Sequence, residues 1–270
     1  YTSTLSFYWR IQLESYFTQR NDCFDVVLMS GNPFLIFEFG NFARRRWHSQ
    51  ILLDYRDPFA NNPRIRYTPF ARSFVANMER GLNFQADQII TVNEDCARRV
   101  VCASDIKVNV IRNGYDERKL PLGRESFDID GQVHFVHAGS FYNYGSPVAF
   151  IDTLKPRRHH FHHIGTPPAQ FSLEAFAQVT LHGRHSYDAT LGILKAAQCG
   201  VVFISKESFE TPTKVFDYIA CGLDLLIICE DTVNKGAMGE LLLDYEHVTW
   251  IANNVQDIEK FLASYRPRRA

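Results

Sequence analysis

The sequence predicts an α/β protein of two domains, each built around a parallel β-sheet. The chain has 270 residues, which is enough for two domains of ordinary size. Short apolar runs typical of buried strands alternate with amphipathic stretches typical of helices in both halves. A charged, turn-rich stretch without periodicity, residues 116–130, indicates the linker between them. We therefore expect domains at residues 1–122 and 123–270.

The composition of the chain excludes several classes of protein. Apolar residues make up 46% of the chain, which supports globular cores, and the net charge of −1 gives no signal for nucleic-acid binding. No run of about 18 apolar residues is present, so no membrane span is expected. The six cysteines are scattered without a CxxC pair, as is typical of core residues in a reducing compartment. Because the start, Tyr1 to Thr4, lacks the basic segment of a secretory signal, we expect a cytoplasmic protein.

The first half alternates strands and helices as an α/β domain requires. In chain order the pattern predicts a helix over 1–19, a strand over 25–30, a helix over 34–47, a strand over 50–53, a helix over 70–84, a strand over 87–92, a short helix over 94–102 and a strand over 107–111.

The helix expected over 34–47 ends in Arg44, Arg45, Arg46 and Trp47. Cations at a helix C-terminus complement the helix dipole, and such ends are most often simply solvated. A basic end that carries an aromatic ring is also a candidate for contact with an anionic membrane surface. Both interpretations stay open here.

Three charged residues, Asp54, Arg56 and Asp57, follow the strand over 50–53. Ligands of parallel sheets bind at the carboxyl ends of the strands, which makes Asp54 and Asp57 candidates for a catalytic or acceptor-positioning role. The alternative is an Asp–Arg pair that only orders the loop.

The second half repeats the alternation. Strands are expected over 132–137, 161–165, 179–183, 200–204, 223–229 and 248–251, with helices over 147–154, 187–198, 212–221 and 255–265. The histidines between Arg157 and Ile164 are candidate ligands of a metal ion. They alternate at strand spacing, no acidic ligand is near, and two arginines would repel a cation, so no metal is predicted.

The stretch from Ile204 to Gly222 combines a buried strand, a polar loop and a helix that opens around Pro212 and Thr213. Glu210, Thr213 and Lys214 lie at that opening. A helix N-terminus with a lysine suits a phosphate group, and a carboxylate one turn later, Asp217, could hold a ribose hydroxyl. The alternative is a capped αβ unit with a solvated lysine and aspartate.

Several segments in this order resemble GT-B glycosyltransferases of family 4 and their relatives. They are ILLDYRDPF, ADQIITVNEDCARRV, KVNVIRNGYDE, FVHAGSF, HHIG, VTLHGRHSYDATLGILKAAQCGVVFI and PTKVFDYIACGLDLLII. The resemblance implies two Rossmann-like domains facing across a cleft, with an N-terminal domain that looks incomplete because only residues 1–23 precede its first strand. It also implies a nucleoside diphosphate sugar as donor, no cofactor or metal, and a glycan or lipid-linked acceptor in polysaccharide or glycoconjugate biosynthesis. The anomeric configuration would be retained, and the enzyme would lie in the cytoplasm or peripherally on the inner membrane face.

The resemblance assigns roles to seven residues of the second half. Gly139 and Ser140 would lie beside the diphosphate, Gly183 and Arg184 would border the nucleobase, Thr213 and Lys214 would hold phosphate, and Asp217 would contact ribose. Two glutamates usually flank the loop before this helix. Asp217 stands at the second position, and Phe209 at the first, with Glu210, a third catalytic candidate, one residue later.

Two other function classes remain open because a fold does not fix a function. One is a sugar-nucleotide enzyme of the same fold with another reaction, such as an epimerase. The other is a non-catalytic binding module. Measured nucleotide affinity, together with turnover of the matching nucleotide sugars, separates the three.

Overall fold

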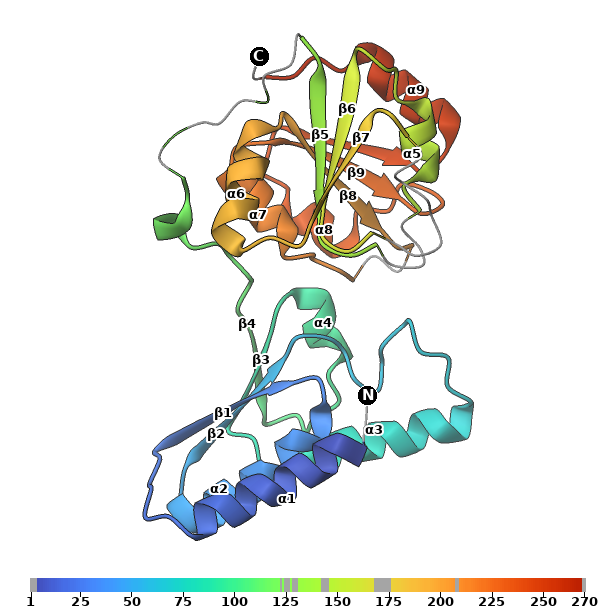
Figure 1. The fold of residues 1–270 in the computed structure, drawn as a ribbon. Coiled ribbons are helices and arrows are strands. Elements are labelled where there is room, and N and C mark those ends of the chain that lie inside the picture. The colour runs from blue at the N-terminus through green and yellow to red at the C-terminus, as the bar shows by residue number, and fades with distance from the viewer. Residues whose placement is uncertain are drawn as a thin grey trace. The chain divides into compact units, whose positions relative to one another are not determined.

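In the computed structural model the chain forms two compact units, residues 1–112 and 113–270, each with its own parallel sheet (Figure 1). The structure describes residues 4–121, 123, 127, 131–141, 146–167, 176–206 and 209–268, without the side chains of residues 4–6. The α/β class is confirmed. The boundary at residue 122, which lies outside the described residues, and the cleft between the domains stay predictions.

The first unit contains a four-stranded sheet in the order β1-β2-β3-β4, with all pairs parallel. Its elements are α1 (Thr4–Thr18), β1 (Val26–Gly31), the 3-10 helix η1 (Phe34–Glu38), α2 (Phe39–Trp47), β2 (Gln50–Tyr55), α3 (Pro69–Asn83), β3 (Gln88–Thr91), α4 (Glu94–Arg99) and β4 (Lys107–Val110). Every second residue of β2 is buried, namely Ile51, Leu53 and Tyr55, which is the period of a strand with one face on a core. In that core the ring of Phe34 stacks on Tyr55, and the ring of Phe37 packs on Tyr55 at a tilt.

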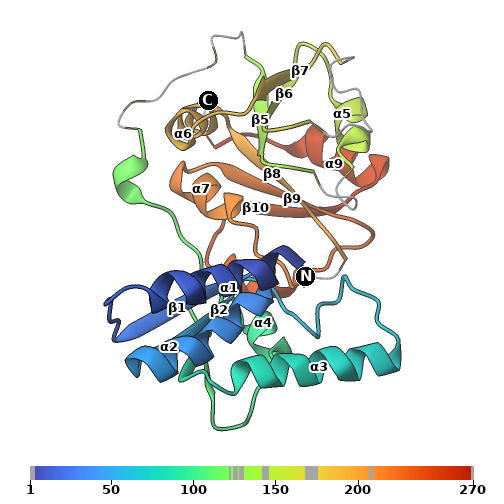
Figure 2. The same cartoon turned by 60° about the horizontal axis from the view of Figure 1, so that its bottom comes forward.

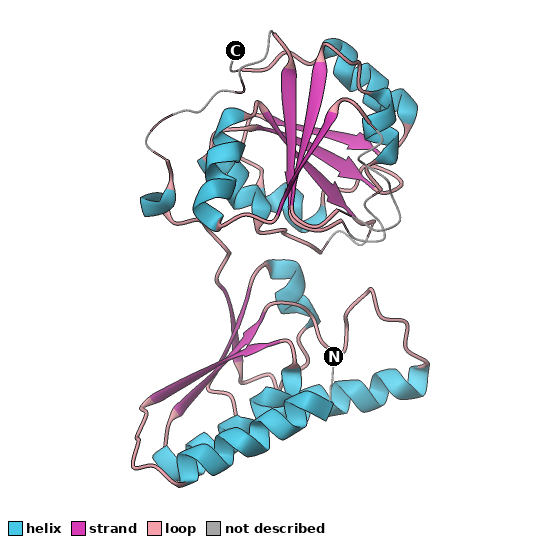
Figure 3. Cartoon of the chain, viewed as in Figure 1, coloured by secondary structure: helices cyan, strands magenta, loops and turns pink. Residues whose placement is uncertain are grey.

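The second unit contains a six-stranded sheet in the order β10-β9-β8-β5-β6-β7, again with all pairs parallel (Figure 3). Its elements are η2 (Glu117–Lys119), β5 (Val133–Ala138), α5 (Val148–Thr153), β6 (His159–Ile164), β7 (Val179–Gly183), α6 (Tyr187–Ala196), β8 (Cys199–Ile204), α7 (Lys214–Ala220), β9 (Asp224–Cys229), α8 (Gly236–Leu241), β10 (Val248–Ala252) and α9 (Val255–Ser264). The sequence analysis did not predict α8, whose first residues are Gly, Ala, Met and Gly.

Helices cover both faces of this second sheet (Figure 2). Apolar residues of α6, α7 and α8 pack on one face, and those of α5 and α9 pack on the other. The strand order is that of the Rossmann fold, in which the chain leaves β5 toward one edge and β8 toward the other. In Rossmann folds such a reversal marks the ligand-binding crevice, which here corresponds to the carboxyl ends of β5 and β8, directly before Gly139 and Ser205.

The structure corrects the prediction for the basic end of α2. Trp47 is only 7% exposed, and its ring meets Phe24 and Phe17 edge-on at 4.8 and 5.2 Å, so Trp47 cannot serve as a membrane anchor in this unit. Arg44 donates to the carboxylate of Asp87 and to the carbonyl of Gln85, both at 2.7 Å. Arg46 donates to the carbonyl of Arg20 at 3.2 Å, and Arg45 is exposed. The prediction for the ring was wrong because residues of α1 and of the segment before β1 cover it.

None of the helices formed by the described residues is long and apolar enough to cross a membrane.

Candidate functional site

Lys214, the first residue of α7, lies at the crevice between β5 and β8. Its ammonium nitrogen is 2.8 Å from Nε2 of His137, a residue of β5. A methyl group built on Gly139 would lie 3.5 Å from the same nitrogen, so Lys214 reaches the backbone just after β5. Gly139 has φ +101°, a conformation that L side chains rarely adopt and that leaves this backbone open to a ligand. A cation and an accessible backbone therefore meet where Rossmann folds bind nucleotides.

Tyr218 fixes α7 in this position. It lies one helical turn after Lys214 and on the same side of the helix. Its hydroxyl accepts a 2.7 Å hydrogen bond from the backbone N–H of Ala138. Its ring packs directly on Gly200 of β8, where an added Cβ would lie only 2.3 Å from the ring. Tyr218 thus anchors α7 to both β5 and β8 and holds Lys214 beside the end of β5.

The surroundings of Lys214 bring its pKa close to neutral pH. Burial lowers the pKa of Lys214 to about 7. Burial also lowers the pKa of His137 well below its usual range, so the imidazole is neutral. A neutral His137 accepts from the ammonium at Nε2 and carries its own proton on Nδ1, which faces Nδ1 of His163 at 3.4 Å. Within the described part of the chain, Lys214 forms no ion pair.

The turns after β5, β6 and β7 are bonded to one another through backbone groups. Gly139 N–H donates to the carbonyl of Ile164 at 2.8 Å, and Gly165 N–H donates to the carbonyl of Gly183 at 2.7 Å. A Cβ on Gly165, which has φ +131°, would lie 3.0 Å from the carbonyl oxygen of Gly139. The structure thus brings Gly139 and Gly183 to the same edge of the sheet.

Three further predicted donor residues are exposed around this edge. Ser140 follows Gly139 directly. Arg184 follows β7, and its Nε donates to the hydroxyl of Thr166 at 3.0 Å. Thr213 is the N-cap residue of α7, but it has helical backbone angles and its side chain makes no capping hydrogen bond.

Asp217 has a partner that the sequence analysis missed. The hydroxyl of Tyr187, the first residue of α6, donates to Oδ1 of Asp217 at 2.6 Å. Burial raises the pKa of Asp217, and the hydrogen bond from Tyr187 opposes that rise. Ser186 caps α6 through a 3.3 Å bond from Ala189 N–H, which presents Tyr187 at the same end of the sheet as α7. The sequence does contain a signal for Tyr187, because the start of α6 follows the end of a strand, just as the start of α7 does.

Glu210 lies in the loop between β8 and α7. Its Oε1 accepts a 3.0 Å hydrogen bond from the hydroxyl of Ser205, the residue after β8. Phe209, at the position where the resemblance places a glutamate, is buried and belongs to the core. The loop around Glu210 therefore differs from the family pattern, and residues 207 and 208 lie outside the described residues.

The two candidate aspartates of the first unit lie at the carboxyl end of β2. Asp54 accepts a 2.8 Å hydrogen bond from the hydroxyl of Ser30 and lies 4.0 Å from the guanidinium of Arg56. These contacts fit the loop-ordering interpretation of Asp54. Asp57 is half-buried two residues beyond the strand.

A buried carboxylate in the same unit was also missed. Glu79 accepts hydrogen bonds from the backbone N–H groups of Ala60 and Val101 at 2.9 and 3.0 Å. Burial raises its pKa to about 7, against the effect of these two donors. Glu79 therefore ties the loop after β2 to the segment after α4, which is a structural role.

The histidines of β5, β6 and β7 bond to one another. Nδ1 of His134 lies 2.9 Å from Nε2 of His162, whose Nδ1 lies 2.9 Å from Nε2 of His182. The ring of Phe127 stacks on that of His162, with centroids 4.0 Å apart. Among the described residues, no group of His, Cys, Asp and Glu side chains could hold a metal ion.

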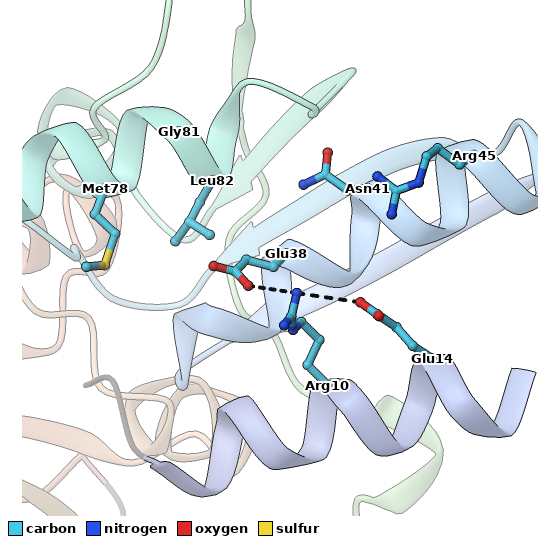
Figure 4. A pocket seen from close by; sticks show the side chains of 8 residues that line it. All are labelled: Arg10, Glu14, Glu38, Asn41, Arg45, Met78, Gly81 and Leu82. Atoms are coloured by element: carbon cyan, nitrogen blue, oxygen red, sulfur yellow. Dashed lines mark ion pairs between the residues drawn. The ribbon is translucent and has the colours of Figure 1, made fainter. Parts of the chain in front are cut away.

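A pocket of about 350 Å³ lies among the helices of the first unit (Figure 4). In it, Arg10 pairs with Glu38 at 3.0 Å and with Glu14 at 3.6 Å. Arg45 also lines the pocket, so its charges sum to zero, and the pocket is lined by helices instead of strand ends. It is therefore a weaker candidate than the crevice at Lys214.

Comparison with solved structures identifies the fold. HepE of Anabaena, solved with UDP and glucose, matches with a TM-score of 0.63 and 13% identity, over 94% of this chain and 72% of that chain. The pneumococcal O-GlcNAc transferase GtfA, solved with UDP and GlcNAc, matches with a TM-score of 0.62 and 11% identity, over 94% of this chain and 53% of that chain. A putative UDP-N-acetylglucosamine 2-epimerase of Listeria monocytogenes matches with a TM-score of 0.54 and 10% identity, over 96% and 70%.

Sequence comparison gives no further identification, since no family model and no curated protein matches the chain. This chain spans about half the length of GtfA. The shared architecture nevertheless extends over nearly all of this chain, through both units. The chain has the GT-B fold of glycosyltransferases, as its sequence motifs predicted.

Proposed function

We propose that the protein transfers a sugar from a nucleoside diphosphate sugar to an acceptor hydroxyl. One observation carries the proposal: the Lys214 ammonium lies beside the open backbone of Gly139 at the crevice of a Rossmann-type sheet. Such a site favours a diphosphate, because it supplies a cation and allows close approach to the backbone. HepE and GtfA were both solved with UDP, which makes UDP the natural first probe.

In the proposed reaction the bond between the anomeric carbon and the β-phosphate oxygen breaks, and a bond to the acceptor oxygen forms. Negative charge develops on the leaving diphosphate, where Lys214 stabilises it more strongly than in the ground state. Thr213 and Ser140 would donate hydrogen bonds to the phosphates. Asp217, oriented by Tyr187, would accept from the ribose hydroxyls.

The base end of the donor would lie against Gly183 and Arg184, on the β7 side of the crevice. Arg184 is exposed and could stack its planar guanidinium on the nucleobase. The acceptor proton would pass to a carboxylate, for which Asp57, Asp54 and Glu210 are the candidates. Of these, Asp57 is favoured because Asp54 and Glu210 already accept hydrogen bonds from Ser30 and Ser205.

The remaining details of the proposal rest on the resemblance to family 4. They are hexosyl transfer with retention, no cofactor or metal requirement, and a glycan or lipid-linked acceptor in polysaccharide or glycoconjugate synthesis. Contact with an anionic membrane at the cytoplasmic face belongs to the same set. Because Trp47 is buried, that contact cannot rest on its ring, and it would depend on the exposed arginines of the end of α2.

Replacement of Lys214 by alanine tests the donor site. Lys214→Ala should weaken UDP binding by about 1.5–3 kcal/mol, the range for hydrogen bonds to charged groups. Lys260→Ala, the same change at an exposed position of α9, is the matched control and should bind UDP like the wild type. Calorimetry with UDP, GDP and ADP measures the affinities. Unchanged affinity in Lys214→Ala would remove the phosphate assignment.

Turnover assays then distinguish the three functions. Transfer or slow hydrolysis of the matching nucleotide sugar supports the transferase. Conversion of the nucleotide sugar into an epimer, in line with the Listeria neighbour, would support the epimerase. Saturable nucleotide binding with neither reaction would indicate a binding module.

A further inference from the structure

One face of α3 carries exposed residues at the spacing that helices use to pair with each other. These residues, here called the α3 seam, are Phe70, Phe74, Asn77, Gly81 and the C-cap residue Phe84. The steps between them alternate between four and three residues, which keeps all of them within a sector of about 80°. The three phenyl rings are 84%, 60% and 85% exposed. Contiguous exposed apolar groups of this kind mark interaction surfaces in soluble proteins.

The opposite side of α3 faces the core of the first unit. The buried residues of the helix are Glu79, Leu82 and Asn83, all in its last two turns. Asn83 accepts a 2.7 Å hydrogen bond from the hydroxyl of Tyr55, and Glu79 accepts from the backbone N–H of Ala60 at 2.9 Å. These contacts fix the rotation of α3 about its own axis, so the seam points away from the core. The first turns of α3 extend beyond the sheet of this unit in both views (Figures 1 and 2).

Gly81 is the small member of the seam. A glycine inside a helix costs about 1 kcal/mol relative to alanine. The first unit itself does not require the glycine, because a Cβ built on Gly81 would meet no described atom within 4 Å. Gly81 lies at the rim of the pocket between α1, α2 and α3 (Figure 4). A missing side chain at such an exposed position allows another backbone or side chain to approach α3 closely.

The seam is complementary to a second copy of itself. Phe70 and Phe84 lie seven residues before and after Asn77, whereas Phe74 lies three residues before it and Gly81 four residues after it. When a second α3 lies antiparallel with the two Asn77 side chains opposite each other, Phe70 of one copy faces Phe84 of the other. Phe74 of each copy then enters the space that Gly81 of the other copy leaves. The two amides of Asn77 lie within reach of each other for a hydrogen bond.

The charges near the seam are compatible with this arrangement. Arg80 donates to Oδ1 of its own Asn77 at 2.7 Å, which leaves the NH2 group of Asn77 for the second copy. In the antiparallel pair Arg80 lies near Ser73 of the other copy, and the two Arg80 residues are about 9 Å apart along the helix axis. Arg72 lies about 160° around the helix from Phe70, on the side away from the seam. The pairing therefore brings no like charges into contact.

We propose that two copies of the chain associate through the α3 seam as a symmetric, antiparallel helix pair. At their exposed fractions the three rings would bury roughly 450 Å² per copy, or about 900 Å² for the pair. The polar neighbours of the rings add to this area, so the interface reaches the lower end of the range for specific association, about 1,200 Å². We therefore expect a dimer of micromolar affinity. The proposal goes beyond sugar transfer, because it can be measured without donor or acceptor.

Sedimentation velocity with the full chain, from about 1 to 200 μM, tests the proposal. The wild type should change from monomer to dimer within this range. Phe74→Ser should lower the association constant about 100-fold, because a symmetric interface loses the same ring twice.

Gly81→Phe separates association from folding. The space around Gly81 is open in the monomer and the replaced glycine disfavours a helix, so this variant should fold at least as stably as the wild type. It places a second ring opposite Phe74 of the other copy and should lower the association constant about 100-fold or more. Phe74→Ala added to Gly81→Phe exchanges the ring and the space that receives it. This double variant should recover association to within about tenfold of the wild type.

Two variants serve as controls. Arg72→Ser changes the side of α3 away from the seam, and Leu243→Ser removes an apolar side chain that is 82% exposed in the second unit. Both should dimerise like the wild type. All the changed positions are exposed, and circular dichroism checks that each variant is folded.

Four results would overturn the proposal. They are a wild type that stays monomeric at about 200 μM, unchanged association of Phe74→Ser, an equal loss of association in either control, and a double variant no better than Gly81→Phe alone. A monomeric wild type that binds lipid vesicles or a single-stranded oligonucleotide, and loses that binding in Phe74→Ser, would assign the seam to that partner instead.

Discussion

The charge of Lys214 should make donor binding depend on pH in a defined direction. Burial lowers the pKa of this lysine to about 7, so the free site is charged below pH 7 and becomes neutral above it. A diphosphate needs the ammonium form. Affinity should therefore be highest below pH 7 and should fall as pH rises, whereas an ordinary surface lysine with a pKa near 10 stays charged at these pH values and would leave the affinity unchanged.

The magnitude follows from the fraction of charged Lys214. With a pKa of about 7, roughly one half of the lysine is charged at pH 7 and one tenth at pH 8, so affinity falls about fivefold between these pH values and about tenfold for each pH unit above 8. The bound diphosphate favours the charged form and raises the pKa of Lys214 in the complex. Binding at pH 7 should therefore take up about half a proton per site.

Neighbouring groups should not contribute to this slope. His137 faces the ammonium directly, and His163 faces His137. Burial lowers the pKa of both, that of His163 to about 4, so both are neutral from pH 6.5 to 8.5. The measured pH dependence of donor affinity should therefore arise from the titration of Lys214.

Calorimetry with a nucleotide sugar at pH 6.5, 7.5 and 8.5, in buffers of different ionisation enthalpy, measures both the affinity and the proton uptake. A nucleotide sugar is preferable to UDP, because a terminal phosphate itself titrates near pH 6. Lys214→Arg is the matched control, since arginine stays charged throughout and should remove the slope and the uptake. A flat wild-type profile, or an equal slope in Lys214→Arg, would refute the reasoning.

Two further predictions concern other residues. Asp57→Asn should leave UDP affinity unchanged and lower turnover by about 10²–10⁴-fold, the range for a general base; an equal fall in UDP affinity would make its role structural. The second unit should lose stability as pH falls from 6.5 to 4, because burial lowers the pKa of His134 to about 4 and the unfolded chain takes up a proton that the fold excludes. A histidine whose pKa is lowered from 6.5 to about 4, as that of His134 is, contributes about 3 kcal/mol to that loss. Urea unfolding at pH 7, 5.5 and 4.5 measures it, and His134→Gln should reduce the loss; an identical loss in that variant would assign it to other groups.

The sequence predicted those parts of the site that depend on local pattern. Alternating apolar runs specified parallel sheets, and the carboxyl ends of such strands specified where Gly139, Gly183 and Lys214 would lie. The contact between Lys214 and His137 was not predictable in the same way. It depends on the packing of Tyr218 over Gly200, which joins α7 to β5 and β8 and leaves no local pattern in the chain.

The basic end of α2 shows why composition alone misleads. Arg44 to Trp47 has the composition of a membrane-contacting helix end, yet the ring is covered by Phe17 and Phe24 from elsewhere in the unit. The pattern of α3 contains the same residue types, but there the rings lie on the face opposite the buried Glu79 and Leu82. The distinction between the two helices required knowing which side of each faces the core.

The residue that accepts a hydrogen bond from Lys214 is a histidine, His137, and this affects how the site binds a diphosphate. A carboxylate in that place would fix the ammonium equally well, but it would neutralise the charge and repel a diphosphate. A neutral His137 accepts one hydrogen bond from Lys214 and leaves its charge uncompensated for the ligand. Burial and the neighbouring charge of Lys214 lower the pKa of His137 and keep the imidazole neutral, and the ring of Phe141 stacks on it with centroids 4.1 Å apart. The sheet therefore orients the cation in advance, which is the condition under which a fixed charge stabilises a leaving group most effectively.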